Sequence, residues 1–278
     1  MRDHFRSASE SALIEIVGIA IFAAIVALIA QITQPQLSGA GLIAVGIILA
    51  VVPAMIWLIA FYRQDKLEPE PKQYIIGMFL LGAILAQAIG QPLIREFFRF
   101  QEWAGQDLLF GFLGSFLIVG VIQEFLKYAA VRYTIFGSAE FDEPVDGIIY
   151  AASAGLGYAT MLNISYVISN GGVDLGVGVV RCAVEALFQA STAGVVGYFL
   201  GQAKFQKMGP LWLPAGLLLA ALLNAVVSEL LDYAPTLGTQ FGFNIWAALI
   251  AAVVIAGAIF AGLLVIMSRM NRPAPARS

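Results

Sequence analysis

The stretch GAGLIAVGIILAVVPAMIWLIAFY, residues 39–62, contains no charged side chain and is apolar almost throughout. A helix of this length would span about 36 Å at 1.5 Å per residue, whereas the hydrocarbon core of a bilayer is roughly 30 Å thick. Runs this long and this apolar are typical of helices that cross a membrane. The stretch therefore predicts a helix embedded in lipid.

The composition of the whole chain agrees with a membrane location. Of its 278 residues, 60% are hydrophobic and 12% are charged, and the mean hydropathy is +0.87. Soluble domains are roughly 45–50% apolar and 25% charged, so this chain has too little polar surface to cover a water-soluble globule. A net charge of −3 gives no basic surface for nucleic acid. The single cysteine, Cys182, excludes an internal disulfide.

Uncharged windows of similar length recur along the chain. Eight of them predict an all-α fold, a polytopic bundle of about eight membrane-spanning helices. We expect one integral membrane domain over residues 1–278, in which polar tails at 1–11 and 268–278 flank a bundle over 12–267. The windows are 12–32, 39–62, 74–94, 108–133, 148–169, 177–205, 211–233 and 243–267.

Basic residues are distributed unequally between the two sides of this bundle. An even number of spans places both termini on one side, with eleven Lys and Arg residues there against Arg95 and Arg99 opposite. Positive charge marks the cytoplasmic side, which predicts an inner-membrane protein, surrounded by membrane lipids, with both termini in the cytoplasm. The stretch 95–103 is expected to lie flat in the outer interface. The eleven are Arg2, Arg6, Arg63, Lys66, Lys72, Arg132, Lys204, Lys207, Arg269, Arg272 and Arg277.

Four predicted spans carry one amide side chain each at a similar depth. Gln123, Asn163, Gln189 and Asn224 lie roughly 15–25 Å from the cytoplasmic ends of their helices, at 1.5 Å per residue. Polar residues are costly in lipid, so they either join helices by hydrogen bonds or form a functional site. We expect Gln123, Asn163 and Gln189 to hydrogen-bond to one another near the middle of the bilayer.

A carboxylate stands beside the first of these amides. Glu124 needs either a partner or a proton at this depth. Lys127 follows three residues later on the same helix face. Two interpretations stay open, a structural Glu124–Lys127 ion pair and a functional carboxylate.

Three motifs of this chain resemble the PrsW family of bacterial intramembrane metalloproteases, which is related to the CAAX-processing enzymes. They read DKLEPEP at 65–71, FDEPVDGIIY at 141–150 and GYFLGQAKF at 197–205. The resemblance extends over roughly residues 60–230. It implies a protease that cuts membrane-anchored substrates, such as the anti-sigma factors of envelope-stress pathways.

The resemblance also implies a zinc site. The family carries a Glu-Glu pair with a downstream Lys, a Glu before an Asn in the next span, and one His in each of two later spans. His and carboxylate side chains hold Zn²⁺ with one position open for water. The bound water then has a pKa near 7, and a glutamate removes its proton.

The carboxylate positions of that site are only partly kept in this chain. The Glu-Glu pair stands here as Gln123 and Glu124, with Lys127 downstream, and the Glu-Asn pair stands as Leu162 and Asn163. Only Glu124, Lys127 and Asn163 therefore match the family pattern.

The histidine positions are not kept. One falls on Gln189 and the other near Ala220, upstream of Asn224, and the single histidine of the chain is His4 in the N-terminal tail. Glutamine is a weak neutral ligand and alanine is none, so we expect no metal and no other cofactor here.

Two functions from different classes follow. One is a degenerate protease that binds a membrane-anchored partner, such as a single-span membrane protein, without cutting it. The alternative is an active intramembrane peptidase in which Glu124 activates water and Gln189 or Asn163 stabilises the oxyanion. The acidic residues Asp142, Glu143 and Asp146 could bind Mg²⁺ or Ca²⁺, although a role at the start of a helix is favoured for Asp146.

Overall fold

The computed structural model describes residues 21–22, 25–26, 28, 39–64, 69–172, 177–241 and 245–270. Every regular element in these ranges is a helix, so the predicted all-α class is confirmed. Six of the described helices are long and apolar enough to cross a membrane. The predicted tail 1–11 with His4, most of the first predicted span 12–32, and most of the tail 268–278 lie outside the described residues.

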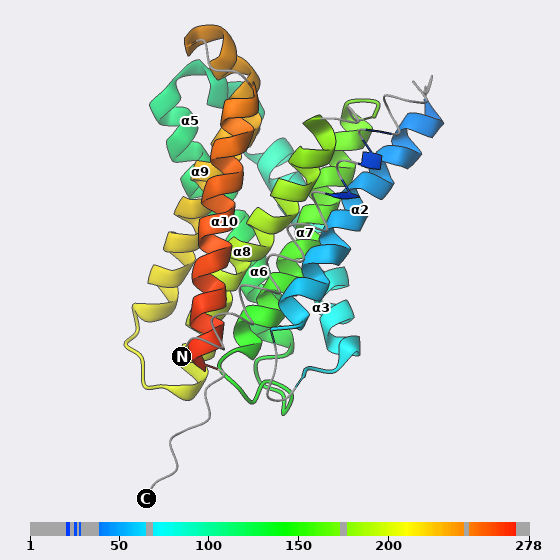
Figure 1. The fold of residues 1–278 in the computed structure, drawn as a ribbon. Coiled ribbons are helices and arrows are strands. Elements are labelled where there is room, and N and C mark those ends of the chain that lie inside the picture. The colour runs from blue at the N-terminus through cyan, green and yellow to red at the C-terminus, as the bar shows by residue number, and fades with distance from the viewer. Residues whose placement is uncertain are drawn as a thin grey trace, which may run out of the picture.

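Seven predicted windows correspond to long helical segments, some of which are built from several consecutive pieces (Figure 1). The count of eight is therefore approximate, because most of the first window lies outside the described residues. The segments are α2 (Ala40–Tyr62); α3 (Lys72–Leu85) with η1 (Ala86–Gly90), η2 (Leu93–Phe97) and α4 (Phe100–Trp103); then η3 (Ala104–Gln106), α5 (Leu108–Gly114), η4 (Ser115–Gly120) and α6 (Val121–Thr134); α7 (Asp146–Ser169); α8 (Val177–Phe205); α9 (Trp212–Phe241); and α10 (Ile245–Met270).

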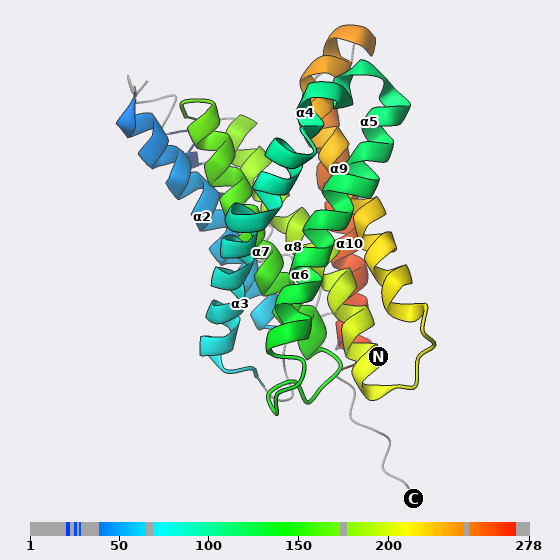
Figure 2. The same ribbon diagram turned by 180° about the vertical axis from the view of Figure 1, so that it is seen from behind.

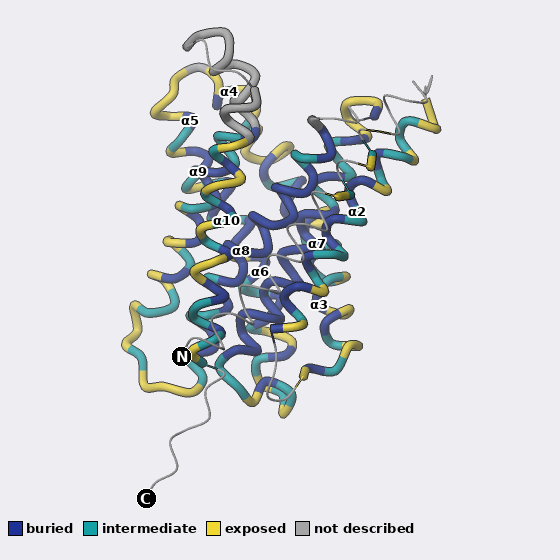
Figure 3. Tube along the Cα trace, in the orientation of Figure 1, coloured by how far each residue is buried: buried dark blue, intermediate teal, exposed yellow. Residues whose placement is uncertain are grey.

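Helix α7 is the centre of the bundle. It contacts α2, α3, α6 and α8, and α3, α6 and α7 lie side by side in Figure 2. Every residue from Asp146 to Thr160 is buried. A helix that is buried all round is typical of the interior of a bundle. Figure 3 shows the same concentration of buried residues along α7 and the middle of α8.

Glycines allow α7 to approach its neighbours closely. A Cβ atom at Gly157 would lie 1.7 Å from the carbonyl oxygen of Phe79 on α3. A Cβ at Gly147 would lie 2.3 Å from the carbonyl oxygen of Gly197 on α8. Small residues at such crossings let helix backbones meet and pack by van der Waals contact in lipid. This close packing fixes the height of α7 against α8, and with it the positions of their polar side chains.

Candidate functional site

Five polar side chains from three helices meet inside the bundle. We call them the polar cluster: Gln123, Glu124 and Lys127 of α6, Gln189 of α8 and Asn224 of α9. Gln123 is 5% exposed and the other four are 0% exposed. The helices therefore place an ion pair and three amides at one buried point, as the similar depths of these residues predict.

The ammonium group of Lys127 lies at the centre of the polar cluster. Its Nζ donates to Glu124 Oε1 at 2.6 Å and to Gln189 Oε1 at 2.6 Å. A longer contact of 3.4 Å reaches Thr192 Oγ1. The Glu124–Lys127 ion pair, one of the two interpretations of these residues, is present, and the ammonium also binds the amide that stands at the expected histidine position.

The amides complete the network around this pair. Gln189 Nε2 donates to Gln123 Oε1 at 2.9 Å and to Glu185 Oε1 at 3.0 Å. Asn224 Nδ2 donates to Gln123 Oε1 at 3.0 Å and to Glu124 Oε1 at 2.7 Å. The expected hydrogen bond between Gln123 and Gln189 is therefore confirmed.

The expectation for Asn163 is wrong. Its Nδ2 donates to the backbone carbonyl of Cys182 at 3.0 Å, not to the other amides. Asn163 is 0% exposed, and its Oδ1 has no hydrogen-bond partner among the described residues. The residue joins α7 to α8 away from the polar cluster, because the rotation of α7 turns this side chain toward the backbone of α8.

The remaining two positions singled out by the resemblance carry apolar groups. Leu162 packs in a small apolar group with Tyr158, Ala86 and Leu126. Ala220 is fully buried and lies one helical turn before Asn224, on the same face of α9. Neither side chain therefore offers a metal ligand to the polar cluster.

A cavity of about 510 Å³ extends from the polar cluster toward one end of the bundle. Gln123 and Tyr158 line its inner part, while Arg95 and Arg181 line the part near the helix ends. The hydroxyl of Tyr158 is buried without a hydrogen-bond partner among the described residues, and so is Oε2 of Glu124. The site thus combines an internally bonded network with two polar atoms that remain to be satisfied.

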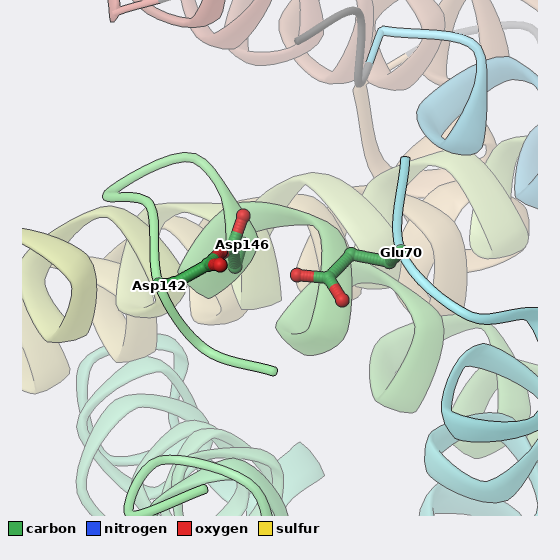
Figure 4. A group of neighbouring side chains, drawn as sticks. All are labelled: Glu70, Asp142 and Asp146. Atoms are coloured by element: carbon green, nitrogen blue, oxygen red, sulfur yellow. The ribbon is translucent and has the colours of Figure 1, made fainter. Parts of the chain in front are cut away.

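A second group of acidic residues lies at the start of α7, whose first residue is Asp146, and Figure 4 shows the three side chains of this group. Glu70, Asp142 and Asp146 each offer an oxygen, and these oxygens lie within 4.8 Å of one another. The Tyr150 hydroxyl donates to Glu70, and Asp146 Oδ2 accepts from the Glu143 backbone N–H at 2.6 Å. The two acidic motifs of the sequence therefore meet in space. The approach of Glu70 to Asp142 and Asp146 was not predicted, although the EPEP motif that contains Glu70 marked this residue as a candidate.

Together, the buried helical core and the intramembrane ion pair define an integral membrane protein with an ionisable site inside its bundle. Residues 70–261 match the model of the PrsW family intramembrane metalloproteases. The chain belongs to this family, and the resemblance drawn from its motifs is confirmed.

Three relatives, each named Protease PrsW, illustrate the match. The protein of Geobacillus kaustophilus is 32% identical over 204 residues, which are 72% of this chain and 87% of that protein. The protein of Bacillus subtilis is 31% identical over 176 residues, covering 63% and 77%. The protein of Halalkalibacterium halodurans is 30% identical over 183 residues, covering 66% and 81%. No solved structure matches the chain.

Proposed function

We propose that this chain keeps the PrsW fold but does not form the family's zinc site, and that it binds a membrane-anchored partner without cutting it. The observation that carries the proposal is the donor set of the polar cluster, in which amides stand at positions 123 and 189, where the family pattern has a carboxylate and a histidine. The Lys127 ammonium lies 2.6 Å from Glu124 Oε1 and from Gln189 Oε1, so two of the remaining oxygens already accept from a cation.

The donor atoms around the polar cluster do not suit zinc. Protein zinc sites use at least three ligands chosen from thiolate, imidazole and carboxylate. Here Glu124 supplies a carboxylate, but its Oε1 already accepts from Lys127 and Asn224. Gln189 turns its Nε2 donor toward Gln123 and Glu185. The hydrogen bonds therefore satisfy most of the cluster internally, as expected for polar groups buried in lipid, and leave Oε2 of Glu124 without a partner among the described residues.

A retained fold supports partner binding. The close glycine contacts of α7 with α3 and α8 keep the helix bundle of the family closely packed. Family members are intramembrane proteases, whose substrates must be reached within the membrane. We therefore expect the partner to be a single-span membrane protein, because such a protein can be reached within the membrane. We expect no binding to nucleic acid.

The proposal is tested by rebuilding the site. The variant Gln123→Glu, Leu162→Glu, Gln189→His, Ala220→His restores the ligand types of the family at their positions in this chain. We expect the purified variant to bind about one zinc ion per chain and the unmodified chain to bind far less, measured by elemental analysis after dialysis. Equal zinc in both proteins would contradict the proposal.

A second function is favoured by one observation. Oε2 of Glu124 has no hydrogen-bond partner among the described residues, and a carboxylate oxygen of this kind can act as a general base. In that case the chain is a peptidase that cleaves single-span substrates without metal. Loss of cleavage in Glu124→Gln, with the fold unchanged, would establish this alternative and exclude the degenerate protease.

A further inference from the structure

The cavity carries an excess of positive charge at one end of the bundle. Among the residues that the structure describes, its charged lining residues are Arg95, Arg181 and Glu185, whose formal charges sum to +1. Arg95 belongs to η2, and Arg181 lies in the first turns of α8. Both arginines therefore stand near the level where the helices leave the hydrocarbon, which the distribution of Lys and Arg predicts to be the outer interface.

The guanidinium of Arg181 is held in place. Its Cζ atom lies 3.9 Å from the centre of the Tyr166 ring, and Tyr166 also lines the cavity. Cation–π stacking fixes the plane of the guanidinium group and limits its rotation. Neighbouring donors include the amides of Gln91 and Gln101.

We propose that this cavity binds the headgroup of an anionic phospholipid. A phosphodiester carries one negative charge, which balances the formal +1 of the lining. Arginine forks bind phosphate oxygens through two parallel hydrogen bonds. The buried hydroxyl of Tyr158, which has no partner among the described residues, supplies a further hydrogen-bonding group deeper in the cavity. Basic pockets between transmembrane helices bind lipid headgroups by the same chemistry.

A lipid fits this place better than an extended peptide. A non-helical peptide brings an N–H and a C=O with every residue, and each needs a partner inside the membrane. A phospholipid brings mainly acceptor oxygens and leaves its acyl chains outside the cavity. Phe97 and Phe110, which are 75% and 66% exposed, precede and follow in the chain the lining residues Phe100, Gln101, Ala104 and Gly105, so this part of the chain presents apolar surface to lipid.

The test uses the full chain, purified in a neutral detergent and supplied with either phosphatidylglycerol or phosphatidylcholine of identical acyl chains. Lipid retained per chain is measured by native mass spectrometry. We expect one tightly retained phosphatidylglycerol, and a fall in affinity of about tenfold or more in Arg181→Gln, since a charge-assisted hydrogen bond contributes on this scale. Arg181→Lys, which keeps the charge, should fall less.

The matched control is Arg99→Gln. Arg99 belongs to the same interfacial stretch but does not line the cavity, and its side chain is 67% exposed. Its replacement should leave lipid retention unchanged. Equal retention of the two lipids, or an Arg181→Gln variant that folds and retains phosphatidylglycerol like the unmodified chain, overturns the proposal. It is also overturned if inorganic phosphate or a soluble glutamate-rich peptide binds with Arg181 dependence while phosphatidylglycerol does not.

Discussion

Replacing Lys127 by methionine tests whether the polar cluster is held together as an internal ion pair. The substitution keeps a long side chain but removes the ammonium that lies 2.6 Å from Glu124 and from Gln189. Glu124 is 0% exposed, so its charge would be left buried without its cation. Breaking a buried pair from one side costs about 3–5 kcal/mol.

A double variant separates the charge from the packing. In Lys127→Met, Glu124→Gln the buried charge is gone, while an amide oxygen at position 124 can still accept from Asn224. We expect the double variant to be more stable than Lys127→Met alone, because the two residues act as one unit. Lys72→Met at the exposed start of α3 is the matched control and should change stability by less than about 0.5 kcal/mol.

The measurement is the free energy of unfolding in mixed micelles, followed by loss of helical structure as denaturing detergent is added. The reasoning is refuted if Lys127→Met is as stable as the unmodified chain. It is equally refuted if the loss of unfolding free energy in the double variant equals the sum of the losses in Lys127→Met and Glu124→Gln, since the two residues would then act independently.

Three further predictions concern the packing, the acidic group and the orientation of the chain. Gly157→Ala should destabilise by about 3 kcal/mol or more, because the new Cβ would lie 1.7 Å from the Phe79 carbonyl oxygen; Gly137→Ala, which meets nothing within 4 Å, should be near neutral in the same unfolding assay. Tyr150→Phe should cost about 1.5–3 kcal/mol through the lost hydrogen bond to Glu70, and an unfolding curve equal to that of the unmodified chain would contradict this role. A green fluorescent protein fused after residue 278 should fluoresce in cells, because the charge distribution places the C-terminus in the cytoplasm; a dark fusion that is active with alkaline phosphatase in its place would show the opposite orientation.

The class of fold and much of the polar cluster could be predicted from the sequence. Membrane spans are long and uniform in composition, so windows such as 39–62 give a strong signal. Glu124 and Lys127 are three residues apart on one helix, so their pairing follows from local geometry alone. The Gln123–Gln189 hydrogen bond followed from their similar depth in the bundle.

Other features depend on information that the sequence does not carry locally. The direction of Asn163 is set by the rotation of α7, which depends on its glycine contacts with α3 and α8. The approach of Glu70 to Asp142 and Asp146 depends on how the loop before α3 reaches the start of α7. Depth can be estimated by counting residues, whereas rotation and loop path result from packing over the whole bundle.

The metal content of the unmodified chain tests the central claim most directly. The chain would be purified without chelator from cells grown with added zinc, and its zinc measured per chain and located by X-ray absorption. The cluster's internal hydrogen bonds predict much less than one zinc ion per chain. One tightly held zinc ion, with Glu124 among its ligands, would contradict the account.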